Sequence, residues 1–279
     1  MSSARTITPP AALTPAQEAC ASCSVYRAAN LKKLGIALDT WDYIVALAGN
    51  PNTGKSTVFN ALTGLRQHTG NWPGKTVTRA EGGYEYDAKR FKLVDLPGTY
   101  SLLSTSLDEQ IARDFILFGQ PDVTVIVADA TRLERNLNLA LQVLEITDRV
   151  VVCLNLMDEA KRHGVTVDER QLARDLGVPV VAASARYGQG LPDVLRAVSD
   201  VASGKMVCRP HRLETEPDAI KPALAELVSQ LEAAYPALPN PRWVALRLLG
   251  GDDTIVTALR NGELTSLGAS SPAQALPGS

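Results

Sequence analysis

The sequence predicts an α/β fold: a phosphate-loop domain with a mostly parallel sheet flanked by helices, followed by a small all-helical domain. Three observations support this prediction. An apolar strand, a glycine-rich loop and a helical pattern follow one another within residues 43–64. Strand and helix patterns then alternate to about residue 201, which indicates parallel strands joined by right-handed crossovers. Beyond Lys205 only helical spacing remains.

The pattern divides the chain into four parts. Residues 1–15 are rich in Ser, Thr, Ala and Pro and bury too little apolar surface to order themselves. The end of the chain is again low in complexity. We expect a partly disordered N-terminal extension, the phosphate-loop domain, the helical domain and a linker tail, at 1–40, 41–204, 205–265 and 266–279.

Composition excludes several classes of protein. The chain has 279 residues, of which 45% are hydrophobic, enough for one large or two modest domains with a core. Its 28 basic and 30 acidic residues leave a net charge of −2, so we expect no nucleic-acid partner. Apolar runs are far shorter than the roughly 20 residues that cross a bilayer. With four cysteines and no signal peptide, the chain is expected to be cytoplasmic and soluble.

Residues 49–56 read GNPNTGKS and follow the apolar run directly. Glycines allow successive backbone N–H groups to turn inward, where they and the helix N-terminus form a cradle for polyphosphate. Lys55 is expected to reach the β- and γ-phosphates, and Ser56 to ligate Mg²⁺. The candidate phosphate-binding residues are Gly49, Asn50, Asn52, Thr53, Gly54, Lys55, Ser56 and Thr57.

Residues 65–78 form a polar, glycine-rich stretch that we expect to be a functional loop. Thr76 is the best candidate there for a second Mg²⁺ ligand; Thr69 and Thr78 are weaker rivals. A hairpin is predicted from the alternating residues 83–87 and 90–95.

The second strand of this hairpin ends in Asp95, which is placed to hold the Mg²⁺ shell through water. Gly98 is placed to offer its N–H to the γ-phosphate. Thr99 and Tyr100 follow where Ras-type enzymes carry a glutamine that orients water, so unassisted hydrolysis is expected to be slow.

The sequence Asn155-Leu-Met-Asp158 follows a predicted buried strand. One carboxylate accepts both N–H donors of guanine, whereas adenine would place a bare ring nitrogen against the negative charge. Asp158 is therefore expected to select guanine. Asn155 would support the base and the loop beneath it; the competing interpretation is an ordinary turn. Backbone N–H groups of Ser184, Ala185 and Arg186 are suited to close on the base. These features predict a phosphate-loop GTPase that binds GTP and GDP.

The remaining patterns complete both domains. Strands are expected at 123–129, 149–155 and 178–183. Helices are expected from residue 106 onward and at 133–146, 168–176, 191–201, 219–235, 242–249 and 253–259.

Two sets of polar residues allow two interpretations each. Asp108 and Glu109 suit a hard divalent cation, but Ser106-x-x-Glu109 is a capping box, which we favour. Cys20 and Cys23 are half of a zinc pattern whose other half would be Cys208 and His211; we favour ordinary thiols. His68 and His163 are isolated in predicted loops and are expected to face solvent.

Together these motifs resemble the ferrous iron transport protein B family over roughly residues 43–260. The resemblance rests on GNPNTGKS, on GNWPGKTV from Gly70, on DLPGTYSL from Asp95, on Asp108-Glu109 with Ala112-Arg-Asp114, and on the two base motifs. It implies a cytoplasmic GTPase domain followed by a helical domain that acts like a GDP-dissociation inhibitor, and then by a membrane permease.

By this resemblance the chain is the regulatory part of an iron(II) transporter, on the cytoplasmic side of the bacterial inner membrane. The downstream permease is absent from this chain, and self-association into a homo-oligomer is left open. The cysteine-containing N-terminal extension departs from the family pattern, so we assign it no role.

We assign catalytic roles to Asn52, Lys55 and Gly98. The Asn52 side chain, the phosphates and the carbonyls of Gly70 and Trp72 are expected to hold K⁺ where other GTPases place an arginine finger. Hydrolysis should then be stimulated by K⁺; the alternative is that Asn52 only braces its own loop.

Two other functions remain open at this point. One is an RNA-associated GTPase of ribosome or tRNA maturation, although the expected basic appendage is missing. The other is a nucleotide-binding module whose hydrolysis is incidental.

Overall fold

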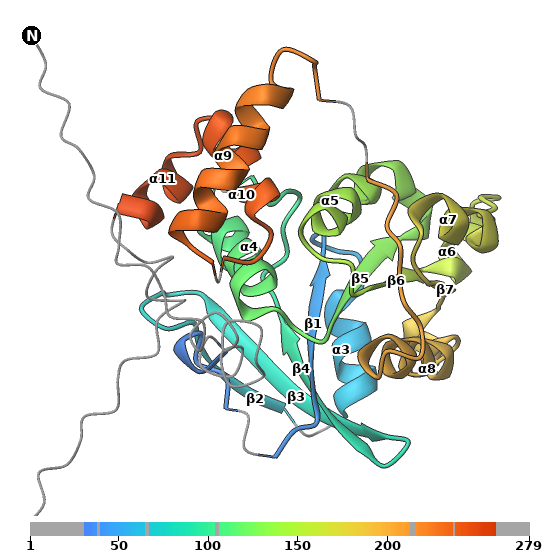
Figure 1. Ribbon diagram of the computed structural model, residues 1–279. Coiled ribbons are helices and arrows are strands. Elements are labelled where there is room, and N and C mark those ends of the chain that lie inside the picture. The colour runs from blue at the N-terminus through green and yellow to red at the C-terminus, as the bar shows by residue number, and fades with distance from the viewer. Residues whose placement is uncertain are drawn as a thin grey trace, which may run out of the picture. The chain divides into compact units, whose positions relative to one another are not determined.

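The computed structural model describes residues 31–37, 40–64, 67–103, 106–212, 216–236 and 238–260. The chain divides into two compact units (Figure 1). Leu34–Glu214 contains the sheet, and the helices after residue 220 belong to the other unit. Each unit is described by itself.

The first unit is built on a seven-stranded sheet. Its order is β2-β3-β4-β1-β5-β6-β7, with parallel pairs from β4 to β7 and antiparallel pairs joining β2, β3 and β4. After β1 the chain forms β2, β3 and β4 on one side of that strand and then β5, β6 and β7 on the other side. Open α/β sheets bind ligands at such a switch point. The strands are β1 (Tyr43–Gly49), β2 (Gln67–Asn71), β3 (Thr78–Tyr86), β4 (Lys89–Asp95), β5 (Val123–Asp129), β6 (Val150–Asn155) and β7 (Val180–Ala182).

Helices cover the sheet because β5 and β6 are apolar almost throughout and must be buried on both faces. α3 and α8 contact one another, and α4 and α5 form a second contacting pair (Figure 1). The helical segments of this unit are α3 (Lys55–Thr63), α4 (Leu107–Gly119), η1 (Ala130–Arg132), α5 (Leu133–Ile146), α6 (Met157–Arg162), α7 (Glu169–Leu176), η2 (Ala185–Tyr187) and α8 (Leu191–Ala202).

The prediction of a loop over residues 65–78 was wrong in its first half. Residues 67–71 form β2, which pairs antiparallel with β3 in the register His68↔Glu81 and Gly70↔Arg79. As the edge strand, β2 has one backbone partner, and the side chains of residues 68–71 are exposed, so no apolar alternation marks it. The predicted hairpin of β3 and β4 is confirmed, with its turn at Asp87 and Ala88, both in the left-handed region.

Residues 205–212 pack on the sheet unit. Arg209 N–H donates to the Gly177 carbonyl at 2.9 Å, and the Arg212 guanidinium donates to the Leu144 carbonyl at 2.8 Å. The Cys208 thiol contacts the Val150 carbonyl at 3.6 Å. The sheet unit therefore extends past Lys205, where the strand pattern stops.

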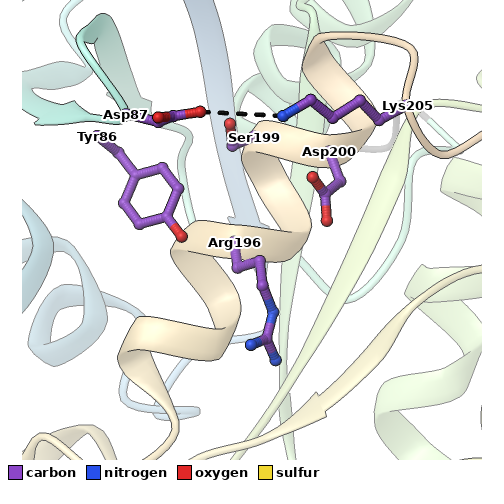
Figure 2. A pocket seen from close by; sticks show the side chains of 6 residues that line it. All are labelled: Tyr86, Asp87, Arg196, Ser199, Asp200 and Lys205. Atoms are coloured by element: carbon purple, nitrogen blue, oxygen red, sulfur yellow. Dashed lines mark ion pairs between the residues drawn. The ribbon is translucent and has the colours of Figure 1, made fainter.

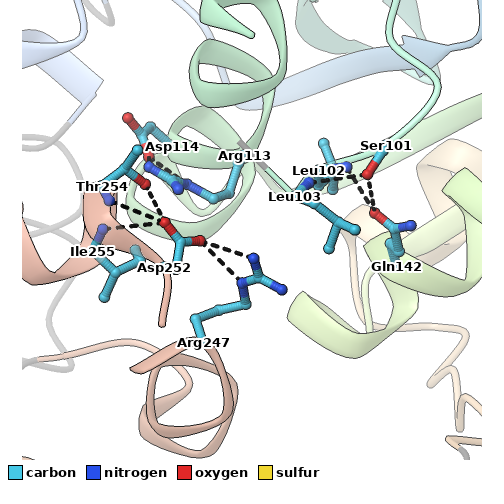
Figure 3. A network of polar contacts seen from close by, with 10 residues as sticks. All are labelled: Ser101, Leu102, Leu103, Arg113, Asp114, Gln142, Arg247, Asp252, Thr254 and Ile255. Carbon is cyan, nitrogen blue, oxygen red and sulfur yellow. Dashed lines mark hydrogen bonds and ion pairs between the residues drawn. The ribbon is translucent and has the colours of Figure 1, made fainter. Parts of the chain in front are cut away.

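The second unit contains α9 (Lys221–Ala234), α10 (Pro241–Leu249) and α11 (Asp253–Arg260), close to the predicted helices. Asn240 caps α10 by accepting the Trp243 N–H at 3.0 Å. Asp252 accepts the Thr254 N–H at 3.1 Å and pairs with Arg247 at 3.0 Å (Figure 3). One carboxylate thus joins the end of α10 to the start of α11. Among the described residues, no helix combines the length and the apolar character that crossing a membrane requires.

Candidate functional site

The phosphate loop lies between β1 and α3, as predicted. Gly54 has φ +78°, and a side chain there would overlap the amide of Asn155. Asn52 also lies in the left-handed region, with φ +66°, a conformation that asparagine tolerates. The Thr53 hydroxyl donates to the Asn50 carbonyl at 3.0 Å. The loop is therefore held in a tight curve in front of the N-terminus of α3.

Lys55 points back towards the end of β4. Its ammonium pairs with the Asp95 carboxylate and donates to the Leu96 carbonyl at 2.7 Å. Burial raises the pKa of Asp95, and the neighbouring Lys55 charge opposes that rise. The predicted phosphate-binding lysine and the predicted Mg²⁺ carboxylate are thus brought into contact.

The segment after β4 closes on the same loop. Thr99 N–H donates to the Gly49 carbonyl at 3.3 Å. A Cβ on Gly98 would lie 3.5 Å from Pro51 N. Gly98 therefore lies against the phosphate loop, as its predicted role requires.

Asn155 joins three predicted motifs. It is 1% exposed, donates from Nδ2 to the Thr53 carbonyl at 3.0 Å, and accepts the Ala185 N–H on Oδ1 at 3.0 Å. The Asp158 N–H donates to Ser184 Oγ at 3.1 Å. The phosphate loop, the Asp158 segment and residues 184–186 therefore meet around one buried amide. The Ala185 N–H is used by Asn155, which ties this segment to the loop.

The Asp158 carboxylate remains accessible at the first turn of α6. Its side chain is 24% exposed, and its nearest cation is Arg162, whose Nη2 lies 3.4 Å from Oδ2. A long contact with an exposed surface arginine leaves the carboxylate available to hydrogen-bond donors from a ligand.

A cavity of about 410 Å³ lies beside the phosphate loop. Asn50 is 3% exposed, and neither its amide oxygen nor its nitrogen has a hydrogen-bond partner. The Arg135 guanidinium lies 4.2 Å from the centre of the Tyr100 ring. The cavity is lined by Asn50, Pro51, Asn52, Thr53, Tyr100, Asp129, Thr131, Arg132, Arg135, Asn136, Leu156, Glu159 and His163.

Sequence reasoning missed the two arginines of this cavity, Arg132 and Arg135. They belong to no recognisable motif. The available signal was their position just after β5, at the edge where parallel strands of such sheets place their ligands. His163 is exposed as predicted, at the rim of the same cavity.

The other predicted ion ligands lie near the sheet edge. Gly70 lies within β2, and Trp72 follows it. Trp72 N–H donates to the Val77 carbonyl, and Lys75 N–H to the Trp72 carbonyl, each at 3.0 Å. Thr76 is exposed in this turn. The bonds of the turn are internal, and β3 and β4 separate β2 from the β1 strand that leads into the phosphate loop. The structure therefore groups Gly70, Trp72 and Thr76 with one another at the β2 end of the sheet, and within the described residues no hydrogen bond joins them to Asn52 or Asp95.

The capping interpretation of Ser106 and Glu109 is confirmed, since Ser106 Oγ accepts the Glu109 N–H at 3.2 Å. Within the described residues, no group of three or more Asp, Glu, His or Cys side chains is arranged to hold a metal. Burial raises the pKa of the Cys208 thiol. Cys20 and Cys23 lie outside the described residues.

A second hollow, of about 460 Å³, lies beside α8 and the turn between β3 and β4 (Figure 2). Lys205 spans it, with Nζ 3.9 Å from Asp87 Oδ2, and both side chains are more than 60% exposed. None of the predicted binding residues lines this hollow, which separates it from the phosphate-loop site.

Gln142 fixes the chain that follows Tyr100. Its Oε1 accepts the Leu102 N–H at 2.7 Å and lies 3.2 Å from Ser101 Oγ (Figure 3). Arg135 and Gln142 both contact this stretch from α5, the helix that begins beside the phosphate loop. The segment after Gly98 is therefore held by α5 as well as by the loop.

A phosphate loop after a central parallel strand, a half-buried aspartate at the end of the adjacent strand and an Asn-x-x-Asp motif behind the loop define a phosphate-loop GTPase fold. A family model described as ferrous iron transport protein B matches residues 43–198, and one of the FeoB cytosolic helical domain matches 217–271. The chain belongs to the ferrous iron transport protein B family.

Individual relatives agree. The Fe(2+) transporter FeoB of Salmonella typhimurium is 41% identical over 215 residues, which are 75% of this chain and 27% of that protein. The chain thus spans about a quarter of the length of the curated relatives it matches.

Solved structures show the same fold. The apo cytosolic domain of T. maritima FeoB has a TM-score of 0.71 at 37% identity, covering 83% of this chain and 88% of that one. The same domain has been solved in GDP and GMPPNP forms. The FeoB G-domain of Methanococcus jannaschii has a TM-score of 0.52 at 46% identity, covering 58% and 97%.

Proposed function

We propose that this chain binds GTP and GDP and slowly hydrolyses GTP to GDP and phosphate, as the cytoplasmic regulatory part of a ferrous iron membrane transporter. The observation that carries the proposal is the buried Asn155 amide, which bonds both to the phosphate loop and to Ala185. That arrangement fixes the distance between a polyphosphate cradle and the carboxylate that reads the base. A generic glycine-rich turn would need no such connection.

Phosphate binding falls to the loop and the N-terminus of α3. Backbone N–H groups of the loop after Pro51 and of the first turn of α3 would face the phosphates, and Lys55 would neutralise their charge. To do so, Lys55 leaves Asp95, its partner in the structure. Phosphate binding and release of the Asp95 carboxylate are therefore linked.

The oxygen donors of the site suit Mg²⁺, which prefers hydroxyl, carboxylate and water ligands. Ser56 would ligate it directly, Asp95 through water, and Thr76 as the added ligand when triphosphate is bound. When bound, Mg²⁺ neutralises charge on the β- and γ-phosphate oxygens.

Potassium is the proposed source of the charge that an arginine finger gives elsewhere. Asn52, with φ +66°, and the carbonyls of Gly70 and Trp72 would hold the ion. A carbonyl has two lone pairs, so the Trp72 oxygen remains a donor to an ion beside its bond from Lys75. Gly98 would offer its N–H to the γ-phosphate, and Thr99 and Tyr100 follow where Ras-type enzymes carry the water-orienting glutamine.

The wider role rests on the family. We infer that the helical unit slows GDP release, that a membrane permease follows in the whole protein, and that the chain works on the cytoplasmic side of the bacterial inner membrane. The proposal includes self-association into a homo-oligomer, which a measurement of the oligomeric state tests. An RNA-associated GTPase is not favoured, because the matched family transports iron and the net charge is −2.

Calorimetry with GTP, GDP and ATP tests the core of this proposal. Asp158→Asn should weaken GTP and GDP binding by about 10²-fold or more, because an amide cannot accept both guanine donors. Asp193→Asn is the matched control, because Asp193 is also a first-turn aspartate paired with an arginine but lies on α8 and lines neither cavity; it should bind like the wild type. Equal affinity of the wild type for ATP and GTP would exclude guanine recognition by Asp158.

A further inference from the structure

The residues just before β1 have no assigned role and lie outside the matched region that begins at residue 43. Residues 34–37, here called the N-terminal segment, nevertheless pack firmly on the sheet unit. Ile36 is 1% exposed. Burying such a side chain removes apolar surface from water, so the packing of this segment stabilises the sheet unit.

Two cations on the antiparallel strands β3 and β4 hold this segment by its backbone. Arg79 of β3 donates from Nη1 to the Leu34 carbonyl at 2.9 Å and from Nη2 to the Gly35 carbonyl at 3.0 Å. Lys92 of β4 donates to the Ala37 carbonyl at 3.1 Å. The planar fork of arginine is suited to two adjacent acceptors, whereas lysine offers a single point of charge.

The same guanidinium reaches the turn that carries Thr76. Its carbon lies 5.4 Å from the centre of the Trp72 ring. Trp72 is 3% exposed, and its ring packs edge-on against Phe115 at 5.5 Å. Arg79 thus contacts both the N-terminal segment and the turn at 72–77.

Glu81 fixes the direction of the guanidinium. Its Oε1 lies 2.7 Å from Arg79 Nε, an ion pair in which neither atom has hydrogen-bond geometry, and its Oε2 lies 2.5 Å from Lys92 Nζ. The side chains of the three residues are at most 13% exposed. With low exposure, the ions are screened weakly and their positions depend on one another.

Gly35 shows how closely the segment and the turn approach. It has φ +81°, and a Cβ there would lie 2.5 Å from Arg79 Nη1 and 2.9 Å from Pro73 Cγ. Any side chain at this position would displace the guanidinium, the turn or the segment itself.

We propose that Arg79 is a positioning residue through which the N-terminal segment holds the turn at 72–77, and with it Thr76. Loss of the contact frees the turn while leaving the phosphate loop and Asn155 unchanged. The consequence for nucleotide binding rests on the proposed function, in which Thr76 ligates Mg²⁺ only with triphosphate. The contact itself does not depend on that function.

Hydrogen exchange on the full chain without nucleotide tests the contact. Gly35→Ala should speed exchange of the Trp72 and Lys75 amides by about ten-fold or more, because both are bonded within the turn. Gly164→Ala is the matched control: Gly164 has φ +68°, but nothing lies within 4 Å of its Cβ position. Arg79→Lys, which keeps the charge but loses the fork, should act like Gly35→Ala.

Affinities for the analogue GMPPNP and for GDP, both with Mg²⁺, supply the second measurement. Gly35→Ala and Arg79→Lys should weaken GMPPNP binding several-fold and leave GDP binding unchanged. Unchanged exchange of the two amides in both folded variants would overturn the proposal. Faster exchange with equal loss of GMPPNP and GDP affinity would overturn the link to Thr76.

If the wild type bound neither nucleotide, the proposed function would fail, and the exchange result would still decide the contact.

Discussion

The two halves of the sheet are stabilised in different ways. In the parallel half, β5 and β6 are buried over almost their whole length, and the polar residue that matters most, Asn155, is bonded on both sides. In the antiparallel half, β2 is exposed, and the turn after it is held by Arg79 and Trp72. Burial makes the parallel half a rigid frame, whereas the edge depends on a few polar contacts that a ligand can exchange.

This difference suits a nucleotide switch. Residues that must stay fixed, such as the phosphate loop and the Asp158 segment, belong to the frame. Residues proposed to respond to the γ-phosphate, such as Thr76, belong to the edge. Segments that rearrange are drawn from parts with few buried apolar contacts, since those open at low cost.

The largest effect is expected at the proposed K⁺ site, where Asn52 of the frame and the carbonyls of Gly70 and Trp72 at the edge would hold one ion. Asn52→Ala should abolish K⁺ stimulation and lower single-turnover GTP hydrolysis in KCl by about 10³-fold, the lower end of what an arginine finger contributes. Wild-type hydrolysis should be fast in KCl and slow in NaCl. Equal wild-type rates in the two salts would contradict the proposal.

Arg135→Gln is the control for this experiment, because Arg135 lines the same cavity as Asn52. It should keep K⁺ stimulation. If Arg135→Gln instead lost most of the rate in both salts, the arginine would be the source of charge.

Within the frame, substitution of Asn155 is expected to lower stability strongly. Asn155→Ala leaves the Thr53 carbonyl and the Ala185 N–H buried without partners, so unfolding free energy should fall by about 2–5 kcal/mol. Urea denaturation measures this loss. Asn136→Ala is the control, because Asn136 is also buried but donates only to the Arg132 carbonyl one turn away. A loss at Asn155 no larger than that at Asn136 would mean that the bridge contributes little.

Sequence reasoning predicted the frame well, because its signals are local. Apolar runs indicated β5 and β6, and the loop and base motifs lie at the strand ends where they were expected. It failed where conformation depends on distant partners. β2 has no apolar pattern and exists through pairing with β3, and the contact between Arg79 and Leu34 joins residues 45 positions apart. No local pattern of polar residues contains that information.

The same limit affected the boundary after Lys205. Cys208, Arg209 and Arg212 pack on the sheet unit through contacts with residues more than 30 positions earlier. A test of the helical unit should therefore end the chain after Glu214, so that these contacts remain. Stopped-flow release of labelled GDP from that shortened chain should be several-fold faster than from the full chain. If the shortened chain folds and releases GDP at an unchanged rate, the helical unit is only a spacer.

The smallest effect is expected at the start of α4, where the capping and metal interpretations of Asp108 and Glu109 can be separated. Ser106→Ala removes the acceptor of the Glu109 N–H, so unfolding free energy should fall by about 1 kcal/mol. Ser106→Thr keeps a hydroxyl and should lose much less. Because acidic side chains in a first turn interact favourably with the helix dipole without a metal, Fe²⁺ should not raise the melting temperature of the wild type through these residues. An Fe²⁺-dependent rise that disappears in the double variant Asp108→Asn with Glu109→Gln would instead establish a metal site at this helix N-terminus.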